Sequence, residues 1–196
     1  MSIKGWRKLV PFCFYTAVIA LLVITAARGP AMAKSRIVIL VVSGFLSWGL
    51  IEYVVHRFVF HLDTFPIFRR NFLNSSHLAH HENPKAMNDL FANLRMSVPI
   101  AGIYWLLAWQ VLGTWLAASY LFVGLVVGYF SYEWLHFQAH HGRSRLPLLR
   151  YLRKYHLLHH YRTPDHRFGV TSPVFDWLFG TFKPVRSRGS SQFAPQ

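Results

Sequence analysis

Any chemistry that this chain performs is expected to depend on histidine. The sequence contains 12 histidines but a single cysteine, Cys13, so a metal ion would have to be held by nitrogen or oxygen ligands. A lone histidine is more often a structural residue than a ligand, whereas several spaced clusters favour metal binding. Ten of the histidines form four clusters, namely His56 and His61; His77, His80 and His81; His136 and His140; and His156, His159 and His160.

The spacing within the clusters fits helices. Positions i, i+3 and i+4 share one helical face, so the three histidines of the second cluster are predicted to converge, as are those of the fourth. His136 and His140 are also one turn apart. His56 and His61 differ, because five positions rotate them by about 140° on an ideal helix. We expect that these two reach different ions, or that the helix ends between them.

The number of clustered imidazoles predicts a dimetal site. Ten exceed the roughly four to six ligands of one ion and suit two ions at about five each. Imidazole binds zinc, copper, iron and nickel, so ligand type leaves the metal open. A structural zinc site is four-coordinate and closed. Ten histidines at the mouth of an apolar bundle instead indicate a redox centre that faces a lipid-accessible cavity.

Two carboxylates precede histidines near the ends of apolar stretches. Glu52 lies four residues before His56, and Glu133 lies three residues before His136. Because carboxylates inside a membrane are costly, we expect them to accept the free N–H of a ligating histidine and so fix its tautomer. The alternative is a carboxylate that reaches the headgroups or pairs with an arginine.

The sequence contains an internal repeat. In each half a glutamate precedes a pair of histidines, and the pattern HxxHH begins sixteen positions after the second member of the pair. A proline follows each HxxHH cluster, Pro84 in the first half and Pro164 in the second. Each half is therefore predicted to be one unit: a membrane helix with two histidines at its end and a second helix with three more.

Composition and hydropathy predict an all-α integral membrane protein. The chain is 53% hydrophobic and 17% aromatic, which is too apolar for an ordinary soluble domain of this length. Four apolar stretches, 9–27, 37–55, 96–112 and 115–135, are predicted to span the bilayer in a single domain, 1–196. A tight connection at Gly113-Thr114 predicts a helical hairpin. Segments 56–95 and 136–182 form the expected cytosolic cap, and 183–196 a flexible tail. We favour an uncleaved first span over a signal peptide cleaved near Ala31-Met32-Ala33.

Charge predicts a membrane surface as a partner. The net charge is +14, and the basic residues are scattered between apolar stretches, which argues against nucleic-acid binding. Three of them precede the first span, three lie in the first loop, five between the second and third spans, and ten from Arg143 onward. The positive-inside rule then places both termini and every histidine on the cytoplasmic side.

The motifs together resemble a known family. HRFVFH begins at His56, HLAHH at His77, HFQAHH at His136 and HLLHHY at His156, and they are followed by FGVTS from Phe168 and by FDW and FGT. Over about 52–182 this combination is similar to the fatty acid hydroxylase and sterol desaturase superfamily, and most similar to its fatty acid 2-hydroxylase branch.

The resemblance implies a fold, a metal and a reaction. It implies a helical membrane bundle with a cytosolic cap, and two iron ions that are bound by all ten clustered histidines. Such enzymes use iron and dioxygen to insert one oxygen atom into a C–H bond of a lipid, and zinc can replace the iron on overexpression. His141 completes the third motif and is expected to support the ligands rather than bind metal. His166 has no counterpart.

The resemblance also implies an electron donor. Fungal and animal 2-hydroxylases resemble fusions to a haem-bearing cytochrome domain, whereas here the first span begins by Leu9, so a separate ferredoxin-like or cytochrome-like carrier is expected. A basic run could dock it. Alternatively, this run lies on anionic lipid, with Leu146, Leu149 and Leu152 turned to the membrane. The run comprises Arg143, Arg145, Arg150, Arg153 and Lys154.

The predicted function is hydroxylation of a fatty acyl chain or membrane lipid. A carotenoid hydroxylase and a sterol-type desaturase are alternatives within the same chemistry, and the sequence does not identify the lipid or the carbon. An alternative of another class is a non-catalytic metal-binding or transport protein. Transport would place ionisable residues deep within several spans, whereas here they gather at one end.

Overall fold

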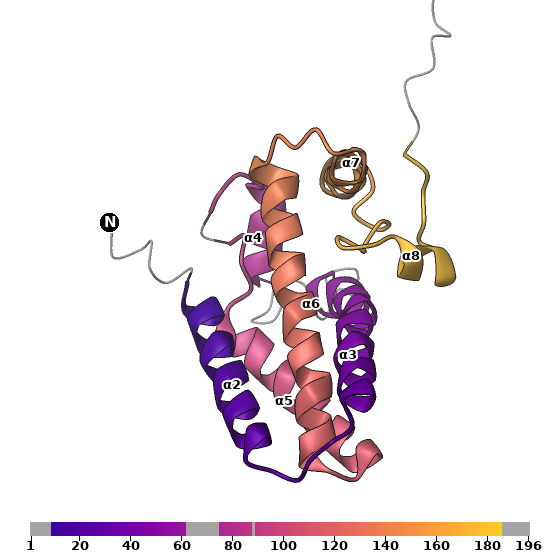
Figure 1. The fold of residues 1–196 in the computed structure, drawn as a ribbon. Helices are drawn as coiled ribbons and strands as arrows, with labels where there is room; N and C mark the ends of the chain where they lie inside the picture. The colour runs from indigo at the N-terminus through magenta and orange to yellow at the C-terminus, as the bar shows by residue number, and fades with distance from the viewer. Residues whose placement is uncertain (1–8, 62–74, 88, 186–196) are drawn as a thin grey trace, which may run out of the picture.

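The computed structural model describes residues 9–61, 75–87 and 89–185 (Figure 1). Every regular element in these ranges is helical, which confirms the all-α prediction. The N-terminal basic residues, the middle of the first cap segment and residues 186–196 of the predicted tail lie outside the described ranges. The elements are α2 (Val10–Ala27), α3 (Lys34–Val55), η1 (His56–Phe60), α4 (Ser75–Glu82), α5 (Leu94–Leu112), α6 (Trp115–His141), α7 (Pro147–Tyr161) and α8 (Val174–Leu178).

Among the described residues, three helical stretches are long and apolar enough to cross a membrane: Val10–Ala27, Lys34–Phe60 and Trp115–His141. The predicted third span corresponds to α5, which contains Arg95 near its start and Pro99 in its interior. This helix is not among the three that qualify. The membrane bundle is therefore confirmed with three candidate spans, and a fourth remains a prediction.

Helices α3 and α6 lie side by side and form the centre of the bundle (Figure 1). Two glycines allow the close contact. A Cβ atom added at Gly44 would lie 1.9 Å from the Leu121 carbonyl oxygen, and one added at Gly124 would lie 1.9 Å from that of Val41. Because no side chain separates the backbones there, the two helices that each carry a histidine pair are held at a short, fixed distance.

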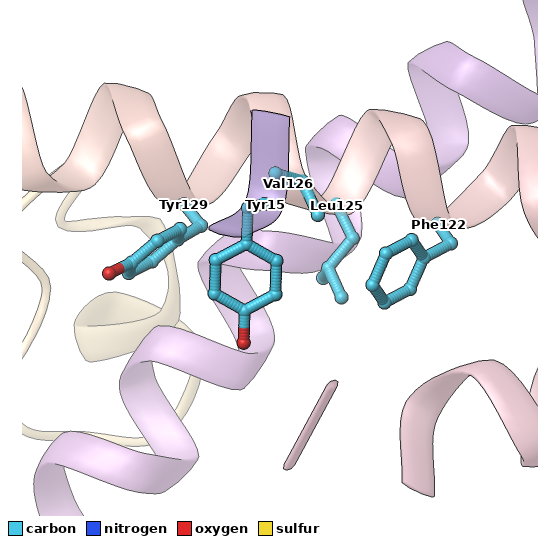
Figure 2. Packing of buried hydrophobic residues seen from close by; sticks show 5 residues of the cluster. All are labelled: Tyr15, Phe122, Leu125, Val126 and Tyr129. Atoms are coloured by element: carbon cyan, nitrogen blue, oxygen red, sulfur yellow. The ribbon is translucent and has the colours of Figure 1, made fainter. Parts of the chain in front are cut away.

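Helices α2 and α5 pack against α6. Tyr15 of α2 contacts the buried cluster Phe122, Leu125, Val126 and Tyr129 of α6, and its ring centroid lies 5.4 Å from that of Tyr129 (Figure 2). Helix α5 joins α6 through Gly113, whose φ of 71° is readily adopted by glycine, and Thr114, whose hydroxyl accepts the N–H of Ala117. The predicted helical hairpin is thus present.

The histidine-bearing helices lie at one end of this bundle. Helix α6 continues to His141, six residues past the predicted end of the span, and so carries its histidine pair without a break. Helix α7 packs against α6, and Figure 1 shows α4 and α7 at the same end of that helix. Four helical segments therefore bring their histidines to one place.

Candidate metal centre

The structure gathers all ten predicted histidines into two groups of five. Within the described residues, the candidate ligand atoms of each group all lie within 4.8 Å of one another. The first group comprises His56, His61, His77, His81 and His159, and the second comprises His80, His136, His140, His156 and His160.

The two halves of the repeat exchange one histidine each. His80 belongs to the first half, yet its Nε2 atom lies 3.1 Å from Nε2 of His140 in the second group. His159 belongs to the second half, and its Nε2 atom lies 3.1 Å from that of His61 in the first group. On a helix, i+3 and i+4 lie about 60° and 40° to opposite sides of position i, so one HxxHH face can serve two neighbouring sites.

A π-helical turn explains how His56 and His61 join the same group. The α-helix ends at Val55, and η1 closes with a hydrogen bond from the backbone N–H of His61 to the carbonyl of His56, 3.2 Å long. Because a π-helix has more residues per turn than an α-helix, positions five apart are rotated by less from one another than on an ideal α-helix. The expectation that the two histidines reach different ions is therefore wrong, whereas the alternative, that the α-helix ends at this point, agrees with the structure.

The distances between ring nitrogens fit bound ions. In the second group, Nε2 of His140 lies 2.9 Å from that of His156 and 3.1 Å from that of His80, and Nε2 of His160 lies 3.0 Å from that of His156. A metal–imidazole bond is about 2.0–2.1 Å long, so two ligands at right angles stand about 3 Å apart. The donor set therefore suits an ion with five nitrogen ligands at adjacent corners of an octahedron.

Backbone carbonyls contact the Nδ1 atom of three grouped histidines, on the opposite side of the ring from Nε2. An Nδ1–H that donates to a carbonyl leaves the Nε2 lone pair free for a metal. Two of these histidines are in the first group and one is in the second. The pairs are His56 Nδ1 with Phe168 O at 2.5 Å, His159 Nδ1 with His166 O at 2.7 Å, and His136 Nδ1 with Leu90 O at 3.1 Å.

The two buried glutamates hold the segments that carry these carbonyls. Glu52 accepts hydrogen bonds from the backbone N–H of Val170, the N–H of Thr171 at 3.0 Å and the Thr171 hydroxyl at 2.5 Å. Glu133 accepts the N–H of Ala92 at 2.9 Å. Val170 and Ala92 each follow, by two residues, a carbonyl that binds a histidine.

The contact between glutamate and histidine differs from the prediction. We expected each carboxylate to accept a histidine N–H directly, but backbone carbonyls take those N–H groups instead. The reason is geometric: a loop that crosses the end of the helix presents a carbonyl to the histidine and an N–H to the glutamate one turn earlier. The glutamates thus act on the histidines through the loop.

A tight turn after α7 provides carbonyl acceptors for two histidines of the first group. Arg167 has a φ of 64°, and the carbonyls on either side of it, those of His166 and Phe168, accept from His159 and His56. The Arg167 side chain donates to the Thr163 hydroxyl and to the carbonyls of Lys183 and Pro184. The turn is therefore tied to the chain before and after it.

Asp176 is a further residue of the site that the sequence did not reveal. It is completely buried and accepts the N–H groups of Phe168 and Gly169, each at 2.8 Å, and the Thr181 hydroxyl at 2.7 Å. The available signal was that Asp176 is the single charged residue between Phe168 and Phe182. A carboxylate in such an apolar stretch needs buried donors.

His141 and His166 lie outside both groups. The half-buried His141 ring stacks on Phe137, with centroids 5.2 Å apart. The His166 ring lies 2.9 Å from Asp165, and only the backbone carbonyl of His166 contacts a clustered histidine. Neither side chain reaches the ten grouped nitrogens.

Burial keeps the clustered imidazoles neutral. Desolvation, and to a smaller extent the neighbouring histidines, lowers the pKa of His61 and His80 to about 3. Desolvation lowers the pKa of His81 to about 4. The same causes hold the pKa of His77, His156 and His159 well below the usual value. Neutral rings have a free lone pair, which is the form that binds a metal.

An apolar cavity adjoins the first group. It has a volume of about 60 Å³ and runs between α2, α3, α5 and α6. His56, Phe60 and Tyr132 line it beside the histidines, and Tyr15 and Leu125 line it deeper in the bundle. Almost all of its wall is apolar, so it suits a hydrocarbon rather than a polar ligand.

A basic groove lies on helix α7. Its volume is about 560 Å³, and its walls include Arg150, Arg153, Lys154 and Tyr161. Leu152, which was one of the leucines considered for membrane contact, is instead buried in the protein. The histidines of α7 lie on the helical face turned away from the groove, so this one helix separates the groove from both groups.

Comparisons with known proteins identify the family. The model of the fatty acid hydroxylase family matches residues 41–181. The chain is 31% identical to the dihydroceramide fatty acyl 2-hydroxylase FAH2 of Arabidopsis thaliana, over 91% of this chain and 74% of that relative. It is 36% identical to the ceramide very long chain fatty acid hydroxylase SCS7 of Saccharomyces cerevisiae, over 71% of this chain and 36% of the relative.

A solved structure extends the likeness to the fold. The structure of full-length Scs7p, in which only the hydroxylase domain is visible, superposes with a TM-score of 0.76 and 30% sequence identity, over 93% of this chain and 67% of that chain. The family match covers α3 from residue 41 onward, all of α6 and every grouped histidine. With its membrane bundle and paired histidine groups, this chain belongs to the fatty acid hydroxylase family of oxidoreductases.

Proposed function

We propose that the protein hydroxylates the fatty acyl chain of a lipid, with two iron ions held by the ten grouped histidines. The observation that carries this proposal is the pair of five-nitrogen groups beside an apolar cavity, in a chain of this family. The relatives named above act on dihydroceramide or ceramide fatty acyl chains, which points to a sphingolipid or a similar lipid as substrate.

Iron bound in both groups would supply the reduction of dioxygen and the oxidation of the C–H bond. Overall, one substrate C–H, one dioxygen, two electrons and two protons give one C–OH and one water. The roles of the protein are positional. The carbonyls of Phe168, His166 and Leu90 hold ring nitrogens in register. The apolar cavity receives the acyl chain beside His56 and excludes water.

The two electrons come from a separate acidic carrier, of the ferredoxin or cytochrome type, that docks on α7. The basic groove supports this proposal by charge. Because helix α7 is about 10 Å thick and its other face contributes to both histidine groups, a carrier in the groove would stand one helix away from both ions.

The site and both termini lie on the cytoplasmic side in this proposal. The distribution of basic residues supports the orientation. A reporter protein fused after Gln196 tests it: activity of a cytoplasm-specific reporter is expected. Activity only of a reporter that requires export would reverse the orientation.

Lipid mass spectrometry tests the reaction. Cells that express the chain are compared with cells that express His80→Ala, which lacks one grouped nitrogen. A gain of one oxygen atom in an acyl lipid that is absent from the variant is expected. Loss of two hydrogens would indicate a desaturase, oxygen on a carotenoid ring would indicate a carotenoid hydroxylase, and an unchanged lipid profile would contradict the enzymatic proposal.

Metal analysis tests the cofactor separately. Protein purified from iron-replete cells is expected to contain about two ions per chain, since five nitrogens converge at each of two points. Zinc can appear on strong overexpression, because it competes well for imidazole. One ion per folded chain, or none, would contradict the dimetal proposal.

A further inference from the structure

The outer face of α8 is apolar and exposed. Trp177 is 73% exposed and Leu178 is 60% exposed, and Val174 and Phe179 are also exposed to a large extent. From Phe168 to Phe182 the one charged residue is Asp176, which is completely buried. The surface of this segment therefore carries no charge, although the basic residues Arg167 and Lys183 flank it.

The inner face of α8 rests on a candidate membrane span. A Cβ atom added at Gly49 of α3 would lie 3.1 Å from the ring of Phe175. The ring of Tyr53 stacks on that of Phe179, with centroids 5.1 Å apart. Gly49 lies seven residues before His56, which is about 10 Å along the helix, so α8 lies against the candidate span Lys34–Phe60 and not beyond its end.

The exposed face of α8 continues a lipid-facing surface of α3. Val42, Phe45 and Leu46 precede Gly49 by seven, four and three residues, which places them on the same helical face one or two turns deeper. All three are exposed in the structure. Figure 1 shows α8 beside the end of α3 that continues into η1. An apolar surface thus runs from the middle of α3 to α8.

We infer that α8 lies in the interface of the bilayer that contains the chain, with Trp177 and Leu178 among the lipids. Tryptophan is enriched at this depth, and basic flanks suit anionic headgroups. A second copy of the chain could also cover α8. If it covered α8 alone, it would leave the adjoining apolar surface of α3, formed by Val42, Phe45 and Leu46, exposed. The continuity of the two surfaces favours lipid.

This position gives α8 a role at the metal centre. Asp176 of α8 holds the N–H groups of Phe168 and Gly169, and the Phe168 carbonyl accepts from His56. Lipid contact on one face of α8 therefore steadies the segment that orients a histidine of the first group. The inference goes beyond the proposed function and does not depend on it.

Fluorescence quenching in vesicles tests the depth of α8. The full chain with Cys13→Ser, which removes the exposed native cysteine, receives Trp177→Cys or Val174→Cys and a bimane label. The control is Tyr161→Cys in the basic groove, where the native side chain is 61% exposed. The vesicles contain phosphatidylcholine and phosphatidylglycerol, with or without bromine on the upper part of the acyl chain.

Labels on α8 are expected to be quenched several-fold more by brominated lipid than the control label, and several-fold less by aqueous iodide. Equal iodide quenching at positions 177 and 161 would overturn the inference. Protection of the α8 labels from both quenchers would overturn it in favour of a protein partner such as a second copy.

Hydrogen exchange tests the link to the metal centre. In the full chain in vesicles, Trp177→Asp combined with Leu178→Asp is expected to speed amide exchange at Gly169, Val170 and Thr171 by about tenfold or more. Leu148→Asp on α7, where the native residue is 66% exposed, is the control and should leave these amides unchanged. Unchanged exchange in the α8 variant would overturn the steadying role. Neither experiment needs metal or turnover, so failure here leaves the proposed function intact.

Discussion

The ring nitrogens of a grouped histidine have separate tasks. Nε2 points to the centre of a group, and in three of the histidines Nδ1 meets a backbone carbonyl. A lone pair is available at Nε2 when the proton sits at Nδ1, so each carbonyl selects the tautomer that binds metal. The carboxylates of Glu52 and Glu133 hold these segments by accepting the backbone N–H two residues after the carbonyl.

Removal of one grouped histidine is expected to empty one site. His159→Ala should lose the ion of the first group and His80→Ala that of the second, although each histidine is encoded in the opposite half of the repeat. Both variants should contain about one ion per chain and lose hydroxylation. His166→Ala is the control, because only its backbone carbonyl takes part. Metal analysis by mass spectrometry measures the result, and metal loss in His166→Ala would mean that the ten-ligand set is wrong.

Substitution of Glu133 is expected to be milder than loss of a ligand. In Glu133→Gln the amide oxygen can still accept the N–H of Ala92, so the loop that carries the Leu90 carbonyl stays in place. Metal should be retained and activity should fall by no more than ~10–100-fold, as for other outer contacts of metal sites. Glu133→Ala removes the acceptor, so its metal content and its activity should both be lower than those of Glu133→Gln. Equal behaviour of the two variants would show that this hydrogen bond does not position His136.

At the scale of helices, the separation of α3 and α6 sets the distance between the histidine pairs. The two glycines at their crossing leave no room for a methyl group. Any side chain there would push apart the helix ends that carry His56 and His136. The bundle is therefore part of the metal centre, because both histidine pairs lie at the ends of these two helices.

Gly124→Ala is expected to destabilise the protein. The added Cβ would meet the Val41 carbonyl at 1.9 Å, and such overpacking costs about 1–3 kcal/mol. Gly102→Ala is a matched control in helix α5, because a Cβ there meets nothing within 4 Å. Thermal unfolding in detergent micelles should show a lower midpoint for Gly124→Ala and an equal or higher one for Gly102→Ala. A midpoint at or above wild type for Gly124→Ala would contradict the close packing of α3 and α6.

Spacing predicted the helices and the convergence of the ten histidines, because helical periodicity is a local property. It could not predict that His80 and His159 change sides, since the partner of a helical face depends on tertiary packing. The π-turn after Val55 also escaped prediction, because the ideal α-helix was the reference for His56 and His61. The Phe168 and Leu90 carbonyls were missed for another reason: every residue has one, so the sequence gives no signal.

At the scale of the molecule, the ten grouped histidines make the free energy of unfolding depend on pH. Unfolded histidines titrate near 6.5, whereas His61 and His80 in the folded protein titrate at about 3 and His81 at about 4. Between these values the unfolded state binds more protons, so the free energy of unfolding falls as the pH falls. The stabilising contribution is complete above pH 6.5 and is lost on acidification.

Metal-free protein, prepared with a chelator, is expected to show this dependence directly. Its unfolding midpoint should be nearly constant above pH 7 and should fall steadily from pH 6.5 toward pH 4. His80→Gln, which removes one of the titrating rings, should show a shallower fall. Circular dichroism during heating at a series of pH values measures both. An unfolding midpoint that rises on acidification would contradict the neutral state of the grouped histidines.

The exchanged histidines have a consequence for how the two ions load. Helix α4 supplies His77 and His81 to one group and His80 to the other, and helix α7 divides its three histidines in the same way. An ion bound in either group therefore orders both helices, and the second ion meets a site whose ligands are already in place. Loading should be cooperative, so that a limited supply of metal yields full and empty molecules rather than half-filled ones.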